Sequence, residues 1–229
     1  MSDHFLPISR RALVLAAGSL AAVAALPVEL AFAQRKAQAQ ADADVAELMK
    51  AGDLPDQAIG ATDAKVTVVE YASMTCGHCA NFHKKVFPAL KTKYVDTGKV
   101  RFIMREFPLD DLAAAASMLS RCAGGSDVKK SYDLTAILFE KQEEWAFVKG
   151  NPVPKLFEIA RQAGFTQDNF DKCLTDQKLL EQITAIRERG SSKFGVNSTP
   201  SFFINGKRLS DAPTVENFEK MIEPLLKAS

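Results

Sequence analysis

The sequence predicts an α/β fold whose sheet-forming parts are separated by a block of helices. Three observations lead to this prediction. A strand–helix–strand pattern spans residues 66–107, and two short strands with a closing helix span residues 201–227. Between them, apolar residues recur at helical spacing from about 110 to 188. A period of two indicates strands and a period near 3.6 indicates helices.

The first unit opens with a strand, Val66 to Tyr71, whose largely apolar composition fits a strand buried on both faces. Apolar residues at four-residue spacing then predict a helix that reaches about Tyr94. Pro88 lies inside this helix and should kink it. A second strand runs from Val100 to Phe107 and ends at a proline.

The later elements follow from the same periods. Helical patterns cover Leu112–Cys122, Val128–Phe139, Pro154–Ala163, a segment capped by Thr166, and Lys178–Phe194. The closing elements are the strands Ser201–Ile204 and Lys207–Leu209, the Asn205-Gly206 turn between them, and a helix, Thr214–Lys227.

This order of elements is typical of a thioredoxin-like fold with an inserted α-helical domain. We expect an export signal at 1–33 and an N-terminal tail with a short helix at 34–60. The thioredoxin-like domain then occupies 61–109 and 189–229, and the helical insertion occupies 110–188.

The N-terminus predicts export. Arg10-Arg11 precedes the apolar run Ala12 to Leu26, and Ala31-Phe32-Ala33 fits a cleavage site, so the mature chain would begin at Gln34. The paired arginines fit twin-arginine export, but also the general secretory route. An uncleaved anchor is the alternative, although the apolar run is shorter than the roughly 20 residues that span a bilayer. We therefore expect a periplasmic protein.

Composition narrows the class of partners. The chain has 47% hydrophobic and 25% charged residues with a net charge of +1, which fits a soluble globular protein without a basic surface for nucleic acid. No cofactor is expected.

Four cysteines in an exported chain indicate an oxidising compartment. We predict a structural disulfide between Cys122 and Cys173; a second redox-active pair and two separate buried thiols are the alternatives.

Cys76-Gly77-His78-Cys79 lies where the first strand gives way to the first helix. Two thiols in one helical turn can form and break a disulfide, and the free N–H groups of a helix start favour a thiolate at Cys76. Half of a zinc site is the alternative, with His83 as a further ligand. A structural zinc site needs four ligands, and the sequence holds no second CxxC, CxxH or HxxxH motif.

Three motifs together resemble the DsbA-like thiol:disulfide oxidoreductases of the thioredoxin superfamily. They are VTVVEYASMTCGHC at 66–79, Pro88 in the next helix, and GVNSTPSFFINGK at 195–207. The resemblance extends from about Lys65 to Lys227. It implies that Cys76 is the attacking thiol and Cys79 the buried resolving thiol. It also implies that Thr199-Pro200 forms a cis-proline loop that pairs its backbone with an extended substrate.

The same resemblance implies that Glu70 is a buried acid behind the disulfide that relays a proton to the resolving thiol. The alternative is a strand-end glutamate that reaches solvent or pairs with Arg105. His78, between the cysteines, can stabilise the Cys76 thiolate and make the disulfide more oxidising. We expect His83 to lie at the surface.

Gly77 departs from the CPHC motif of strong DsbA oxidants, and CGHC occurs in protein disulfide isomerases. The first expectation is an oxidase that passes its Cys76–Cys79 disulfide to reduced, unfolded exported proteins and is reoxidised by a DsbB-type membrane partner. An isomerase or reductase of the same fold is the alternative. Dedicated periplasmic isomerases carry a dimerisation domain for which the N-terminal tail is too short, so we expect a monomer.

Overall fold

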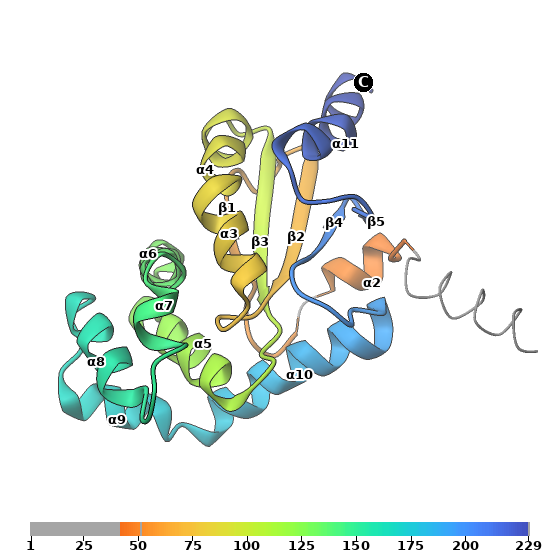
Figure 1. The fold of residues 1–229 in the computed structure, drawn as a ribbon. Coiled ribbons are helices and arrows are strands. Elements are labelled where there is room, and N and C mark those ends of the chain that lie inside the picture. Colours follow the sequence, from red (N-terminus) through yellow and green to blue (C-terminus); the bar gives the residue numbers. More distant parts are fainter. Residues whose placement is uncertain (1–41, 51, 229) are drawn as a thin grey trace, which may run out of the picture. The chain divides into compact units, whose positions relative to one another are not determined.

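The computed structural model describes residues 42–50 and 52–228, so the predicted export signal lies outside the described residues. A five-stranded sheet, ordered β1-β3-β2-β4-β5, forms its core (Figure 1). The strands are β1 (Gln57–Ile59), β2 (Val66–Ala72), β3 (Val100–Glu106), β4 (Ser201–Ile204) and β5 (Lys207–Arg208). Strands β2 and β3 are parallel, and the other neighbours pair antiparallel. The predicted α/β class is confirmed.

The connection from β2 to β3 is helical but broken. It consists of α3 (Gly77–Lys85), α4 (Phe87–Leu90) and a π-helical turn, η1 (Lys91–Val95). Pro88 lies in the first turn of α4. A continuous helix would require an N–H that proline lacks, so the chain ends one helix and starts another, as the predicted kink implies.

Six helices lie between β3 and β4: α5 (Asp111–Gly124), α6 (Val128–Glu140), α7 (Gln142–Trp145), α8 (Val153–Gln162), α9 (Gln167–Leu174) and α10 (Gln177–Phe194). Side chains of Asp110, Asp127, Thr166 and Asp176 accept first-turn N–H groups and fix four of the helix starts. The short helix α7 was not predicted. Helix α10 runs through residue 188, where the sequence placed a domain boundary.

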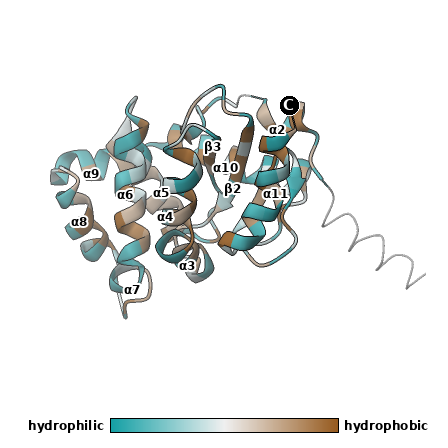
Figure 2. Cartoon of the chain, turned by 90° about the horizontal axis from the view of Figure 1, so that it is seen from above, coloured by the Kyte–Doolittle hydropathy of each residue, from teal (hydrophilic) through white to brown (hydrophobic). Residues whose placement is uncertain are grey.

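Side chains alternate between the two faces of the sheet, and helices cover both faces. The larger cluster joins β2 and β3 to α3, to α11 (Val215–Lys227) and to the inserted helices, through residues such as Val68, Phe82, Phe102 and Phe218. The smaller cluster joins Val69, Tyr71 and Ile103 to α10 and to the short helix α2 (Val45–Met49). In Figure 2 the outer helices carry both teal and brown segments, as amphipathic helices do.

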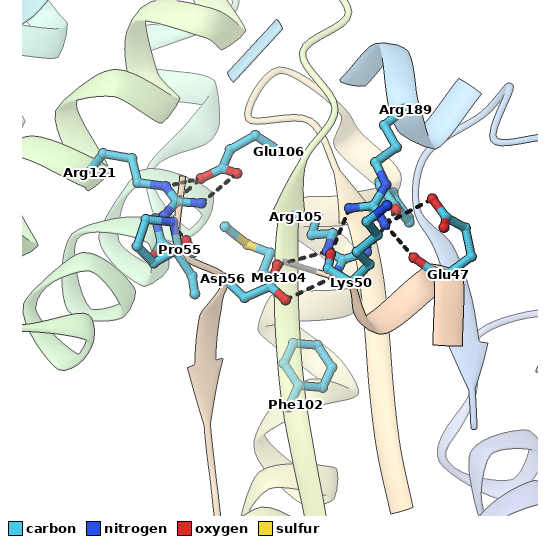
Figure 3. Close-up of polar contacts among 12 residues, drawn as sticks. Glu47, Lys50, Pro55, Asp56, Phe102, Met104, Arg105, Glu106, Arg121 and Arg189 are labelled. Carbon is cyan, nitrogen blue, oxygen red and sulfur yellow. Dashed lines mark hydrogen bonds and ion pairs between the residues drawn. The ribbon is translucent and has the colours of Figure 1, made fainter. Parts of the chain in front are cut away.

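Three arginine side chains donate hydrogen bonds to the segment that precedes β2 (Figure 3). Arg105 donates to both carboxylate oxygens of Asp56, at 2.8 and 2.9 Å. Arg121 donates to the carbonyl of Pro55, and Arg189 donates to the carbonyl of Lys50. These contacts hold β1 at the edge of the sheet. The sequence predicted a tail with a short helix for this segment and no strand, because a three-residue strand carries too little periodicity to be recognised.

The predicted Asn-Gly hairpin joins β4 to β5. Asn205 and Gly206 both have positive φ, 45° and 84°, which the tight two-residue turn requires. The Asn205 side chain accepts the N–H of Thr67 at 2.7 Å and so ties the hairpin to β2. Among the helices of the described residues, none has the length and apolar character needed to cross a bilayer.

Candidate active site

Cys76 lies at the start of α3, as its N-cap residue, directly after the loop that leaves β2. Its Sγ accepts the backbone N–H of Cys79 at 3.3 Å, so a sulfur takes the place of the oxygen of an ordinary N-cap. Its side chain reaches little solvent, with 8% of the residue exposed, and neither Cys76 nor Cys79 is in a disulfide. The site therefore holds a nucleophilic sulfur at the positive end of a helix.

The surroundings of Cys76 lower its pKa from 9.0 to about 5. The largest cause is hydrogen bonding from the Cys79 side chain, and the Thr199 side chain and the N–H groups of Cys79 and His78 act in the same direction. Burial opposes them. At neutral pH the reduced site thus contains a Cys76 thiolate.

Cys79 lies one turn deeper and is 0% exposed. Burial raises the pKa of this thiol well above 9.0, and its hydrogen bond to Cys76 and the negative charge of Glu70 add to the increase. The two sulfurs therefore differ sharply although they lie in one helical turn. Cys76 is suited to attack and to leave as a thiolate, and Cys79 holds its proton until a reaction removes it.

The loop before β4 covers the sulfur of Cys76. The Thr199–Pro200 peptide bond is cis, as the sequence predicted. The Cys76 thiol donates to the carbonyl oxygen of Thr199 at 3.3 Å. The Thr199 Oγ1 is buried and has no hydrogen-bond partner among the described residues, so its hydroxyl is available to donate to the Cys76 thiolate. Thr199 and Pro200 thus lie beside the sulfur of Cys76.

Glu70 is fully buried in β2, and its Oε2 lies 2.8 Å from the Nε2 of His83. The alternative prediction, that Glu70 pairs with Arg105, is wrong. In the parallel pairing Glu70 is opposite Met104, so Arg105 lies beside Tyr71 on the other face and donates to the Tyr71 hydroxyl. The acid therefore faces α3, the helix that carries both cysteines.

The expectation that His83 lies at the surface is also wrong, since only 5% of its side chain is exposed. It follows Cys79 by four residues and so shares the inner face of α3. Its ring stacks on Phe139 of α6 at 4.4 Å between centroids. The four-residue spacing was the signal in the sequence that could have revealed it.

The two residues between the cysteines differ in what they contribute. His78 is exposed, and among the causes of the lowered Cys76 pKa it supplies its backbone N–H. A role for its imidazole stays a prediction. Gly77 is the first residue of α3, and a Cβ placed on it would meet no atom within 4 Å. The glycine is therefore not required by crowding.

Gln142 of α7 was missed by sequence reasoning. This side chain is 2% exposed, and its amide nitrogen donates to the carbonyls of Met74 and Cys76 at 2.7 and 3.1 Å. The insertion thereby holds the active-site loop directly. Nothing in the local sequence marks a glutamine for this contact, because it joins segments more than sixty residues apart.

Cys122 and Cys173 form a disulfide that links α5 to α9 across 51 residues of chain, the pairing that the sequence predicted.

The alternative of a zinc site at Cys76, Cys79 and His83 would require His83 to give up its contact with Glu70. Across the described residues, no group of three or more histidine, cysteine or acidic side chains is arranged to hold a metal ion.

Comparisons with known proteins agree with this geometry. A family model described as thioredoxin matches residues 52–224. A protein-disulfide oxidoreductase of Rickettsia bellii is 37% identical over 154 residues, which are 67% of this chain and 58% of that protein. Disulfide bond formation protein D of Bacillus anthracis is 27% identical over 181 residues, with 75% and 78% of the two chains covered.

Solved structures extend the likeness. The crystal structure of alpha-DsbA1 from Wolbachia pipientis is similar with a TM-score of 0.73 and 30% sequence identity, covering 80% of this chain and 96% of that one. This chain spans 58 to 63% of the length of the first three curated rickettsial relatives.

Proposed function

The chain belongs to the thioredoxin family, among its DsbA-like members, and on this premise we propose that it is a thiol:disulfide oxidoreductase that introduces disulfides into exported proteins. The oxidised form would hold a Cys76–Cys79 disulfide. A substrate thiolate attacks Cys76, the bond between Cys76 and Cys79 breaks, and Cys79 leaves with the electron pair. The second substrate thiolate then attacks the mixed disulfide, and Cys76 leaves as a thiolate, so the substrate is oxidised and the protein reduced.

The low pKa of Cys76 is the observation that supports an oxidase. At pH 7 the ionisation of a thiol with a pKa of about 5 stabilises the reduced form by about 2.7 kcal/mol relative to a thiol that stays protonated. At about 30 mV for each 1.4 kcal/mol, this raises the reduction potential by on the order of 60 mV. The Cys76–Cys79 disulfide is therefore expected to be transferred readily to substrate thiols. The CGHC sequence keeps an isomerase or reductase of the same fold as the second candidate.

The setting of this reaction is part of the proposal. The predicted export signal supports a periplasmic site of action, where disulfides persist. Reduced, unfolded exported proteins would be the substrates, and the backbone of the Thr199-Pro200 loop would receive them. A DsbB-type membrane protein would restore the disulfide, and the chain would act as a monomer.

Equilibration of the purified protein with glutathione redox buffers tests the choice between oxidase and reductase. We predict a reduction potential nearer that of the strong oxidant DsbA, about −120 mV, than that of thioredoxin, about −270 mV. It also predicts that the oxidised protein converts reduced ribonuclease to its disulfide form. A potential close to that of thioredoxin would favour the reductase.

A further inference from the structure

The helical insertion binds the backbone of the reacting cysteine through Gln142 of α7. The amide nitrogen of this residue donates to the carbonyl oxygens of Met74 and Cys76, at 2.7 and 3.1 Å, and the residue is 2% exposed. We infer that Gln142 is a positioning residue of the exchange reaction, which fixes the start of α3 so that the Cys76 sulfur keeps the hydrogen bonds that stabilise its thiolate. The inference rests on the proposed function, because it concerns the sulfur that exchanges disulfides there.

The loop that leads to Cys76 is a tight turn with several attachments. The N–H of Cys76 donates to the carbonyl of Ser73 at 3.1 Å, so the turn is closed by its own backbone. The Thr75 hydroxyl donates to a carboxylate oxygen of Asp110, which caps α5, at 2.7 Å. Neither bond involves the carbonyl of Met74 or that of Cys76. Those two groups are the ones that the insertion binds, so they have a separate attachment.

The carbonyl of Cys76 joins α3 to the insertion. It accepts the N–H of Ala80 at 3.1 Å, the first hydrogen bond of the helix, and also the amide N–H of Gln142. A carbonyl oxygen has two lone pairs and can accept both bonds. The first bond fixes the oxygen within α3, and the second fixes this end of α3 relative to α7.

The carbonyl of Met74 depends on Gln142. Met74 is 2% exposed, and among the described residues its oxygen accepts no other hydrogen bond. A buried carbonyl without a partner is unfavourable, so without Gln142 the turn would be driven to move toward water or another donor. Because the turn ends at Cys76, such a movement would displace the reacting sulfur.

The hydrogen bonds of the sulfur are sensitive to such a displacement. Cys76 has φ −83° and ψ 115°, an extended conformation in which Sγ accepts the N–H of Cys79 at 3.3 Å. The thiol also contacts the carbonyl oxygen of Thr199 at 3.3 Å. A misplacement of about 1 Å in reacting groups can lower a rate by about a hundredfold. A small shift of the helix start would therefore change how well the thiolate is stabilised and presented.

Helix α7 is itself held firmly, so it can act as a support. Trp145 is 0% exposed and donates its indole N–H to the carbonyl of Leu138 in α6 at 2.8 Å. The N–H of Ala146 donates to the backbone carbonyl of Gln142 at 2.8 Å. The orientation of the Gln142 amide follows from chemistry, because two carbonyl oxygens require a donor and only the nitrogen end of the amide supplies one.

A role in stability alone makes a different prediction. If Gln142 only satisfied two buried carbonyls, its loss would lower the free energy of unfolding and leave the Cys76 thiol of the folded protein unchanged. Positioning predicts that two properties of the folded protein change together, namely the pKa of Cys76 and the redox equilibrium of the Cys76–Cys79 pair. They are linked because the thiolate exists only in the reduced form.

Two substitutions of nearly the same size test this difference. Gln142→Met removes the donor and keeps the length of the side chain, whereas Gln142→Glu introduces a carboxylate that cannot donate and repels both carbonyl oxygens. Each protein is equilibrated with glutathione, two thiols of which reduce the Cys76–Cys79 disulfide and become joined as oxidised glutathione. We expect the equilibrium of Gln142→Met to shift about tenfold toward the protein disulfide, which is about 30 mV less oxidising. The shift should be larger in Gln142→Glu.

Thiolate absorbance near 240 nm gives the second readout on the same samples. The midpoint of the Cys76 titration should rise by about one pH unit in Gln142→Met, since a tenfold redox shift corresponds to a tenfold change in the acid constant. The matched control is Glu143→Gln, which changes an exposed neighbour on α7 and should keep the parent values of both quantities. Denaturant unfolding of each protein measures the effect on stability separately.

Parent values of the midpoint and of the glutathione equilibrium in folded Gln142→Met, whatever its unfolding free energy, would overturn the inference. Shifts of equal size in Glu143→Gln would overturn it as well. If Gln142→Glu does not fold, Gln142→Met decides alone.

The outcomes also distinguish this inference from the proposed function. If the parent protein does not oxidise reduced ribonuclease but Gln142→Met shifts both the midpoint and the equilibrium, the positioning role stands and the oxidase role fails. If the parent oxidises ribonuclease and Gln142→Met matches it in both quantities, the positioning role alone is wrong.

Discussion

The two cysteine pairs show how far surroundings decide the behaviour of the same side chain. Cys76 and Cys79 lie in the first turn of α3, reduced, with a Thr199 loop against one sulfur and Glu70 behind the other. Cys122 and Cys173 lie in two helices of the insertion and are already joined. The first pair is separated by two residues, begins a helix and has thiols with unequal pKa values. The second pair closes a loop of 51 residues.

The first pair is suited to disulfide exchange, and the second pair is suited to stabilising the fold. A disulfide between residues three apart closes a very small loop, so it is held by local geometry and is easily exchanged when its reduced form is stabilised. A disulfide across 51 residues removes much of the freedom of the unfolded chain. Changes to the first pair should therefore alter reaction rates and potentials, and changes to the second should alter unfolding.

The largest expected effect is the loss of exchange in Cys76→Ser, because the thiolate is the reacting species. Cys79→Ser should instead accumulate mixed disulfides with substrate, since the first attack remains possible. Oxidation of reduced ribonuclease measures the first effect and non-reducing gels of trapped complexes measure the second. Substantial activity in Cys76→Ser would remove the central role assigned to this sulfur.

Removal of the second pair, by Cys122→Ser with Cys173→Ser, should lower the free energy of unfolding by about 4 kcal/mol, an upper figure from the chain-entropy model. Ribonuclease oxidation by the folded variant should be retained. Denaturant unfolding gives the first quantity. An unchanged unfolding midpoint would show that α5 and α9 pack equally well without the bond.

The reduced and oxidised proteins should respond differently to pH. The pKa of Cys76 is depressed in the folded reduced state, from 9.0 to about 5, so its stabilising contribution is fully present above pH 9 and is lost as the pH falls through 5. At pH 7 it amounts to about 2.7 kcal/mol. Denaturant unfolding of both forms from pH 4 to 8 should show the reduced form gaining on the oxidised form as the pH rises. Parallel curves would contradict the assigned pKa.

The smallest expected effect is that of His78→Ala. Removal of an exposed imidazole between the cysteines should make the protein less oxidising by about 30 mV or less. The modest size follows because the Cys76 thiolate is held by Cys79, Thr199 and backbone N–H groups that this change leaves in place. Glutathione equilibration of the variant beside the parent measures it. A shift of several times that size would make the imidazole a principal determinant of the potential.

The parts of this molecule that depend on neighbouring residues could be predicted from the sequence. The Asn205-Gly206 hairpin, the Thr166 cap and the break at Pro88 each follow from local chemistry, and each is found in the structure. The CxxC motif at a strand–helix junction likewise pointed to a helix-start thiolate at Cys76.

The rest depends on contacts between remote segments. His83 is buried because Phe139, 56 residues later in the sequence, stacks on it, and Gln142 reaches the active-site loop from α7. Glu70 pairs with His83 and not Arg105 because strand register puts Arg105 on the opposite face. The i, i+4 spacing from Cys79 could have placed His83 on the inner face of α3. No local pattern identifies the remote residues that His83, Glu70 and Gln142 contact.

The environment of α3 keeps Cys76 as a thiolate while Cys79 stays protonated. The most direct measurement is the pH dependence of thiolate absorbance near 240 nm for the reduced protein, with the oxidised protein as baseline. We predict one transition with a midpoint near pH 5, assigned to Cys76 by its loss in Cys76→Ser, and no second transition below pH 9. A single midpoint between pH 8 and 9, the range of an ordinary thiol, would contradict it.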